Sequence, residues 1–78
     1  NWTVYILKCN DGKFYTGFTN NLNRRLKEHE EGKSFSTSYR LPFELVTYIV
    51  FCDKQKAYAF EKYLKSGSGI AFRNKRLV

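Results

Sequence analysis

Five side chains in this sequence have the chemistry of a reactive site, and they come from distant parts of the chain. They comprise two phenols, an arginine, a histidine and a carboxylate: Tyr5, Tyr15, Arg25, His29 and Glu61. A guanidinium binds anionic oxygens in a planar fork, a carboxylate binds a hard cation such as Mg²⁺, and an imidazole or a phenol transfers protons. Such a set could act on an anionic substrate if the fold brought its members together.

Arg25 and His29 lie on the inward stripe of a helix that the sequence predicts over Leu22–His29. At 100° per residue, both share a face with Leu22 and Leu26. A cation that points into a protein interior is costly unless an anion waits there. The pattern indicates a bound anion, an internal carboxylate partner, or an arginine that reaches the edge of a small core. A histidine on such a stripe is more often a core residue than a catalyst.

Glu61 lies on the apolar stripe of a second predicted helix, Lys54–Lys65, for which Asp53 is a good N-cap. Burying an ion without a partner costs several kcal/mol. We therefore expect Glu61 to face a metal ion, Arg25, or both. The alternative is a Glu61–Arg25 ion pair with a structural role only.

The two tyrosines belong to a predicted hairpin. Its strands are expected at two segments: Trp2–Cys9 and Lys13–Phe18. A three-residue loop, Asn10-Asp11-Gly12, would pair Tyr5 with Gly17 and place Tyr5 and Tyr15 on one face as diagonal neighbours. Glycine at the last loop position suits the left-handed residue of that loop type. A two-residue turn would instead pair Tyr5 with Phe18 and send the tyrosines to opposite faces; we favour the first register.

Composition predicts one domain, residues 1–78, with an anionic partner. Fourteen Lys and Arg against seven Asp and Glu give a formal net charge of +7, and 18% of the residues are aromatic. On so small a surface this charge favours nucleic acid. The two cysteines, Cys9 and Cys52, lack metal-ligand spacing, which argues against zinc. A reduced, intracellular chain is the simplest expectation, and no apolar run approaches the ~20 residues of a membrane span.

The remaining segments complete the predicted element order β-β-α-β-α-α. A Ser-rich loop over Lys33–Arg40 carries two cations that could touch phosphates, Lys33 and Arg40. A third strand, Phe43–Cys52, is apolar on both faces, which predicts cover on both sides of a small sheet. Ser66–Gly69 is expected to break the second helix, and a last short helix follows at Ile70–Leu77.

The two tyrosine-bearing segments resemble the paired signature of the GIY-YIG endonuclease superfamily. The first reads VYIL at Val4–Leu7 and the second YTG at Tyr15–Gly17; NNLNRRLKEH at 20–29 and the helical Glu61 fit the same pattern. The resemblance covers nearly the whole chain and is closest to small single-domain bacterial members. Thr3 replaces the glycine of the first triplet, and Thr16 replaces the usual aliphatic residue of the second.

This resemblance implies an α+β fold, with a three-stranded antiparallel sheet flanked by helices, and a metal-dependent endonuclease. Tyr5 and Tyr15 match the motif tyrosines, Arg25 the helical arginine, His29 a position often occupied by histidine, and Glu61 the metal-binding glutamate. Further contacts to nucleic acid are expected from four residues: Gly17, Lys33, Arg40 and Asn74. Asn74 matches a polar residue that some members place near the site.

The residue chemistry suggests roles for this set. Glu61 would hold Mg²⁺ or Mn²⁺ with most of the metal's waters retained, and Arg25 would stabilise charge that grows on the phosphate. We expect Arg25, the metal and the net positive charge to favour the phenolate of Tyr5, which makes Tyr5 the candidate general base. Tyr15 would orient water or phosphate, and His29 would assist proton transfer.

Two questions stay open at this level. A non-catalytic basic module would keep the charge and the aromatic residues, although binding alone requires no buried carboxylate. The sequence carries no recognisable specificity domain, so DNA is expected but its structure is not predicted, and a target-recognition partner or a longer parent chain could supply selectivity.

Overall fold

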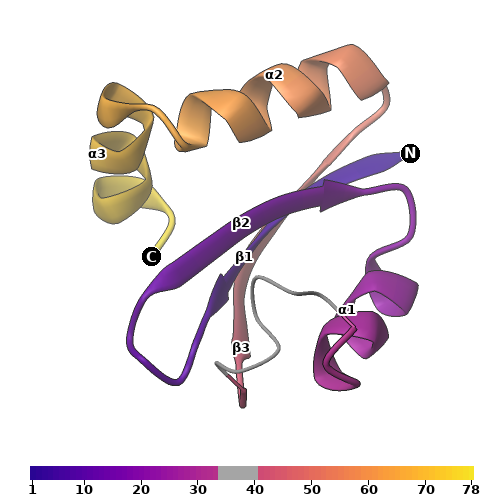
Figure 1. Cartoon of the computed structure of the whole chain (residues 1–78). Coiled ribbons are helices and arrows are strands. Elements are labelled where there is room, and N and C mark those ends of the chain that lie inside the picture. Colours follow the sequence, from indigo (N-terminus) through magenta and orange to yellow (C-terminus); the bar gives the residue numbers. More distant parts are fainter. Residues whose placement is uncertain (34–40) are drawn as a thin grey trace.

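A computed structural model of the chain describes residues 1–33 and 41–78. Its elements are β1 (Trp2–Lys8), β2 (Phe14–Thr19), α1 (Leu22–Glu30), β3 (Glu44–Phe51), α2 (Lys54–Leu64) and α3 (Gly67–Arg76). The three strands form one antiparallel sheet in the order β2-β1-β3, flanked by helices (Figure 1). The predicted α+β class and element order are confirmed. Within the described residues, no helix is both long enough and apolar enough to cross a membrane.

The hairpin has the three-residue loop that its sequence predicts. Tyr5 pairs with Gly17, and Leu7 pairs with Tyr15. Cys9 N donates to Lys13 O at 2.9 Å, and Gly12, at φ +80°, provides the left-handed residue that closes the loop. Because cross-strand partners share a face, Tyr5 and Tyr15 lie on the same side of the sheet.

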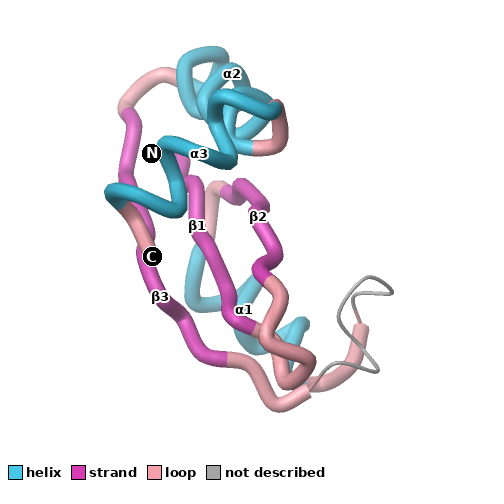
Figure 2. Tube along the Cα trace, turned by 90° about the vertical axis from the view of Figure 1, so that its left-hand side faces the viewer, coloured by secondary structure: helices cyan, strands magenta, loops and turns pink. Residues whose placement is uncertain are grey.

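The two faces of the sheet pack against different helices. Val4 and Ile6 point to one face and form the buried core with Ala57 and Leu64 of α2. Burying a side chain of leucine or isoleucine contributes roughly 1.5–3 kcal/mol, so this face holds the helices to the sheet. Tyr5 points to the other face, toward α1. Figures 1 and 2 show α2 and α3 on one side of the sheet and α1 on the other.

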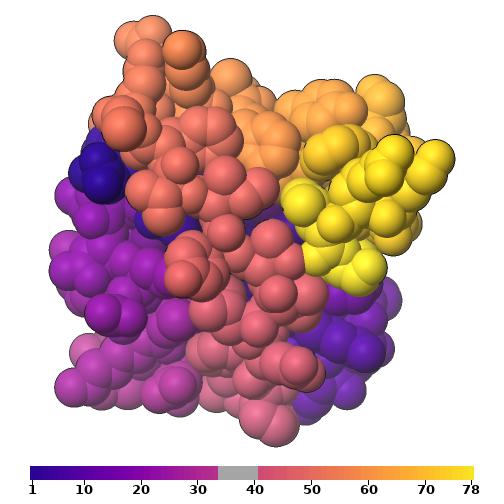
Figure 3. All heavy atoms as spheres, turned by 180° about the vertical axis from the view of Figure 1, so that it is seen from behind, coloured from indigo at the N-terminus to yellow at the C-terminus, as the bar shows by residue number. Residues whose placement is uncertain are grey.

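Strand β3 is less covered than its sequence predicts. Tyr48 is 56% exposed and Val50 is 52% exposed, and β3 side chains are visible on the surface in Figure 3. These residues pair with Tyr5 and Thr3, which places them on the α1 face. The expectation of cover on both faces is wrong for β3 because the aromatic contacts of α1 reach Tyr5 and the β2 side of the sheet.

The last helix begins earlier than predicted. Ser66 is its N-cap, and the Ser66 hydroxyl accepts a hydrogen bond from Gly69 N at 3.2 Å. The expected break after α2 is therefore one capped turn, and α3 starts at Gly67 rather than at Ile70. A serine at the N-cap satisfies a backbone donor that the helix leaves open, which explains how a glycine-rich start can still be helical.

Candidate active site

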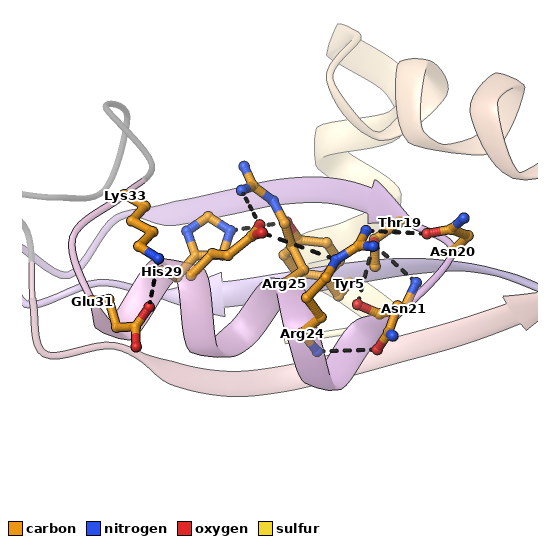
Figure 4. A network of polar contacts seen from close by, with 10 residues as sticks. Tyr5, Thr19, Asn20, Asn21, Arg24, Arg25, His29, Glu31 and Lys33 are labelled. Carbon is orange, nitrogen blue, oxygen red and sulfur yellow. Dashed lines mark hydrogen bonds and ion pairs between the residues drawn. The ribbon is translucent and has the colours of Figure 1, made fainter.

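Helix α1 is fixed against the end of β2 by local hydrogen bonds. Asn21 is its N-cap and accepts from Arg24 N at 3.0 Å, while the Thr19 hydroxyl accepts from Asn21 N at 3.1 Å. These bonds set the direction in which the helix leaves the sheet. The inward stripe of α1 then passes under the tyrosine face, as Figure 4 shows for Arg25 and His29.

Tyr5, Tyr15 and His29 form one aromatic cluster. The His29 ring centroid lies 5.8 Å from that of Tyr5 and 5.2 Å from that of Tyr15, both edge-on, and the two phenol rings are 6.3 Å apart. The Tyr5 hydroxyl is hydrogen-bonded to His29 Nε2 at 2.9 Å. Tyr5 and His29 are both fully buried. The structure thus brings together three of the residues that the sequence singled out.

Gly17 leaves room for the Tyr5 hydroxyl. A Cβ atom at this position would lie 2.6 Å from Tyr5 Oη and 3.1 Å from Tyr15 Cε2. Any side chain would therefore displace the phenol from His29. The glycine of the second triplet acts here by its lack of a side chain, and its backbone lies beside the two phenols.

Arg25 lies beside the same cluster and is paired with a carboxylate of its own helix. Arg25 Nη1 donates to Glu28 Oε1 at 3.0 Å. Burial alone would lower the pKa of Arg25, but the hydrogen bonds to Glu28 and to the Tyr5 phenol raise it. The expected pairing of Arg25 with Glu61 is not what the structure shows, because the spacing of three residues on α1 places Glu28 nearer.

Burial sets the protonation states of the hydrogen-bonded pair. It raises the pKa of Tyr5 to about 12, with a further contribution from Tyr15, and the opposing effect of Arg25 is smaller. Burial and the Arg25 charge lower the pKa of His29 to about 4. Arg25 thus favours the Tyr5 phenolate, as expected, but burial outweighs it. In the protein alone both groups are uncharged at neutral pH, so the expectation of a phenolate is wrong there.

The direction of this hydrogen bond follows from the surrounding donors. Arg25 carries only donors, and its guanidinium favours the negatively charged form of the Tyr5 oxygen by lowering the pKa of Tyr5. A protonated phenol has one hydrogen to donate, and His29 Nε2 is 2.9 Å away. We therefore assign Tyr5 as the donor and His29 Nε2 as the acceptor, with the neutral imidazole protonated at Nδ1.

Glu61 approaches the edge strand β2 from the opposite face. Near the start of α2, the Tyr58 ring centroid lies 5.5 Å from that of Phe18 at the end of β2. The C-terminal end of α2 lines a pocket with the start of β2. The helix therefore runs antiparallel to the strand. Glu61 lies between these two contacts, is only 7% exposed, and forms an ion pair with Lys65. The expectation that its partner must be a metal ion or Arg25 overlooked this lysine, one turn later on the same helix.

Comparison with known proteins places this geometry in a family. A sequence model of the GIY-YIG catalytic domain matches residues 1–74. The chain belongs to the GIY-YIG family. This GIY-YIG domain is 44% identical over 66 residues to the UPF0213 protein BH0048 of Halalkalibacterium halodurans, a match that covers 83% of this chain and 70% of the relative. It is 39% identical to the UPF0213 protein YazA of Bacillus subtilis, over 83% of this chain and 67% of that protein.

A solved relative has the same fold. The solution NMR structure of the UPF0213 protein BH0048 from Bacillus halodurans superposes with a TM-score of 0.61 at 38% identity, covering 95% of this chain and 82% of that one. The names of these UPF0213 relatives state no activity. The GIY-YIG catalytic domain itself implies nuclease activity on DNA.

The GIY-YIG domain offers one carboxylate suited to a divalent metal. Within residues 1–33 and 41–78, no three His, Cys, Asp or Glu side chains gather into a metal cluster. Glu61 is buried beside the edge strand. Its carboxylate forms an ion pair with the Lys65 ammonium and so already binds one cation. A single hard carboxylate fits Mg²⁺ or Mn²⁺, ions that keep water ligands and take others from a bound phosphate.

The other predicted nucleic-acid contacts have different surroundings. Lys33 lies past the end of α1, exposed, with its ammonium 3.1 Å from Glu31 Oε1 (Figure 4). Asn74 accepts hydrogen bonds from Arg73. Arg40 lies outside the described residues.

Sequence reasoning did not assign three charged residues to this region. Glu28 follows Arg25 by three positions and Lys65 follows Glu61 by four, spacings that place side chains side by side on a helix and are visible in the sequence. The third, Arg73, stacks on Phe14 of β2. No local pattern gives that contact, because it depends on how α3 folds back onto the sheet.

Proposed function

We propose that this domain is a metal-dependent endonuclease that hydrolyses phosphodiester bonds in DNA. The observation that carries the proposal is the buried hydrogen bond from Tyr5 to His29, with the Arg25 guanidinium beside it. Arg25 is paired with Glu28, yet its guanidinium also lies beside two phenols and an imidazole, and a structural core does not need a cation there. A site that must bind a phosphate and move a proton needs this combination.

The proton path follows from the protonation states. A free Tyr5 phenolate is disfavoured by a pKa of about 12, so Tyr5 acts as a relay. As the water oxygen bonds to phosphorus, the water proton passes to the Tyr5 oxygen, the phenol proton passes to His29 Nε2, and the bond to the leaving oxygen breaks. The leaving oxygen is then protonated from solvent.

Substrate binding prepares His29 for this step. The Arg25 charge contributes to its low pKa. A phosphate bound to Arg25 offsets that charge, so the pKa of His29 rises toward the range in which imidazole accepts a proton. Arg25 meanwhile donates to the non-bridging oxygens as their charge grows.

The remaining roles rest on position. Glu61 would hold the metal, which when bound supplies Lewis-acid polarisation of the phosphate and charge stabilisation for the leaving oxygen. Tyr15, at the edge-on contact with His29, orients the water or the phosphate. Gly17 leaves the space that the Tyr5 hydroxyl occupies beside His29.

The test is a cleavage assay on labelled DNA and RNA structures that include duplex, single-stranded, flapped and branched forms, with Mg²⁺ or Mn²⁺. Tyr5→Phe should lower the cleavage rate by about 10²–10⁴-fold and leave DNA binding unchanged, because it removes only the hydroxyl. Tyr48→Phe is the matched control, because Tyr48 is exposed on β3. This variant should cleave DNA at the wild-type rate.

Glu61→Ala tests the metal role separately. It should abolish metal-dependent cleavage while the domain remains folded by circular dichroism. If the wild-type domain cleaves no substrate, and its DNA binding ignores both Mg²⁺ and Glu61, the domain is a binding module and the proposal is wrong.

A further inference from the structure

A pocket beside the candidate active site has no role in the proposed hydrolysis. It has a volume of about 400 Å³ and opens along the start of β2. Its lining comes from β2, α2 and α3: Phe14, Tyr15, Thr16, Leu64, Lys65, Ile70 and Arg73. Two cations face it, and no acidic side chain of the described residues lines it. The volume is within the range of sites that hold small ligands.

Arg73 is held in place at this pocket. Its guanidinium carbon lies 4.9 Å from the centroid of the Phe14 ring, and its Nε and Nη2 donate to Asn74 Oδ1 at 3.1 and 2.9 Å. A surface arginine normally loses rotamer freedom when it binds an anion. Here the ring and the amide have already restricted it, and Nη1 makes neither of these hydrogen bonds to Asn74.

The pocket also adjoins the reactive groups. Tyr15 lines it, and the Tyr15 ring contacts His29 on the α1 face of the sheet. Lys65 lines it and forms the ion pair with Glu61. The apolar part is partly open to solvent, because Ile70 is 39% exposed. Positive charge and apolar surface thus lie together next to the place where the scissile phosphate would bind.

We propose that this pocket is a nucleotide subsite that holds the nucleotide next to the scissile phosphate. Arg73 and Lys65 would bind its phosphate, and Ile70 would pack against its sugar. Asn74 would act as a positioning residue for Arg73. This proposal rests on the proposed nuclease function, but the binding of a nucleotide to the pocket can be measured without cleavage.

The experiment is an NMR titration of the ¹⁵N-labelled domain with thymidine 3′,5′-bisphosphate, with thymidine as the ligand that lacks phosphate. We expect shifts of the Tyr15, Thr16 and Ile70 amides and of the Arg73 Nε–H that saturate together. Thymidine alone should give much smaller shifts. The bisphosphate should also inhibit cleavage in competition with DNA.

Variants assign the binding to Arg73. Arg73→Gln should weaken bisphosphate binding about tenfold, the loss expected for one charge-assisted hydrogen bond. Asn74→Ala should weaken it less, and this loss should be absent in the Arg73→Gln background, because Asn74 acts through Arg73. Arg76→Gln is the matched control, since Arg76 is an exposed cation on the same helix that does not line the pocket.

Two results would overturn the subsite: equal binding of thymidine and its bisphosphate, or equal losses in Arg73→Gln and Arg76→Gln. The second would mean diffuse attraction by the positive surface. If the wild type cleaves DNA but the bisphosphate leaves these residues unshifted, only the subsite fails. If the bisphosphate binds as expected and no nucleic acid is cleaved, the pocket is a nucleotide-binding site but not a subsite of a nuclease, and the nuclease proposal fails.

Discussion

Replacing Gly17 by alanine should disable the candidate site without touching any reactive group. The added Cβ would lie 2.6 Å from Tyr5 Oη and 2.7 Å from Tyr5 Cζ. Real Cβ atoms do not approach other atoms so closely, so either the phenol or strand β2 must move. Tyr5 is only 1% exposed, which leaves it no open space to enter.

The size of the effect follows from this crowding. Overpacking a buried site costs about 1–3 kcal/mol, and a Tyr5 hydroxyl pushed away from His29 leaves a buried imidazole nitrogen without that donor. For a domain of this length, 1 kcal/mol lowers Tm by roughly 4–8 °C. We therefore expect Gly17→Ala to melt about 10 °C below the wild type. Cleavage should fall as far as it does in Tyr5→Phe.

Thermal unfolding by circular dichroism gives the first measurement, and the His29 Nε2 chemical shift reports loss of the hydrogen bond. Gly67→Ala is the control, because a Cβ at Gly67 meets nothing within 4 Å. It should melt at or slightly above the wild-type temperature, since alanine favours a helix over glycine. If both variants melt and cleave alike, Gly17 does not position Tyr5 and the role assigned to the second triplet's glycine is wrong.

Individual contacts give three further predictions. Because the pKa of His29 is about 4 in the folded protein, below the ordinary histidine value of 6.5, the unfolded chain binds the proton first as pH falls. The stability that neutral His29 contributes above pH 6.5 is lost between pH 6.5 and 4, by about 3 kcal/mol. Urea unfolding should show a weaker pH dependence in His29→Gln. Lys65→Gln should tighten Mn²⁺ binding, measured by calorimetry, since Glu61 loses its competing cation, whereas Lys62→Gln should not. Leu64→Ala should lower the free energy of unfolding by about 2–5 kcal/mol, because Leu64 is 1% exposed in the core.

The sequence predicts the hairpin well because its information is local. Asn10-Asp11-Gly12 selects the loop type, the loop fixes the register, and the register places Tyr5 and Tyr15 on one face. The helix bearing Arg25 and His29 is equally local, since its cap and its apolar spacing lie within one segment. Local sequence patterns therefore suffice to predict that the two phenols and the imidazole lie together.

Helical spacing makes Glu28 and Lys65 candidate ion-pair partners, but the same patterns do not choose between them and a partner elsewhere in the fold. Helical spacing shows that Arg25 and Glu61 both point inward, which suggests that they meet. In the fold, α1 and α2 lie on opposite faces of the sheet. Each charge therefore finds its partner on its own helix, Glu28 or Lys65. The choice between a partner one turn away and one across the molecule depends on tertiary geometry.

The pKa of Tyr5 was predicted in the wrong direction for a related reason. Sequence reveals nearby charges but not the depth of burial, and for Tyr5 burial outweighs Arg25. A phenol that stays protonated changes the chemistry, because it cannot wait as a phenolate for its substrate. In the proposed mechanism Tyr5 passes its proton to His29 as it receives one from the water, which gives His29 a necessary role there.

The opposite placement of the two helices also limits where a substrate can bind. Tyr5, His29 and Arg25 lie on the α1 face, and Glu61 approaches from the α2 face. A phosphate that contacts both sets must pass along the outer edge of β2, the strand that ends the sheet. Gly17 lies on this strand, and its missing side chain lets the Tyr5 hydroxyl sit against the strand. In our proposal, the edge strand is therefore where the two halves of the site act on one phosphate.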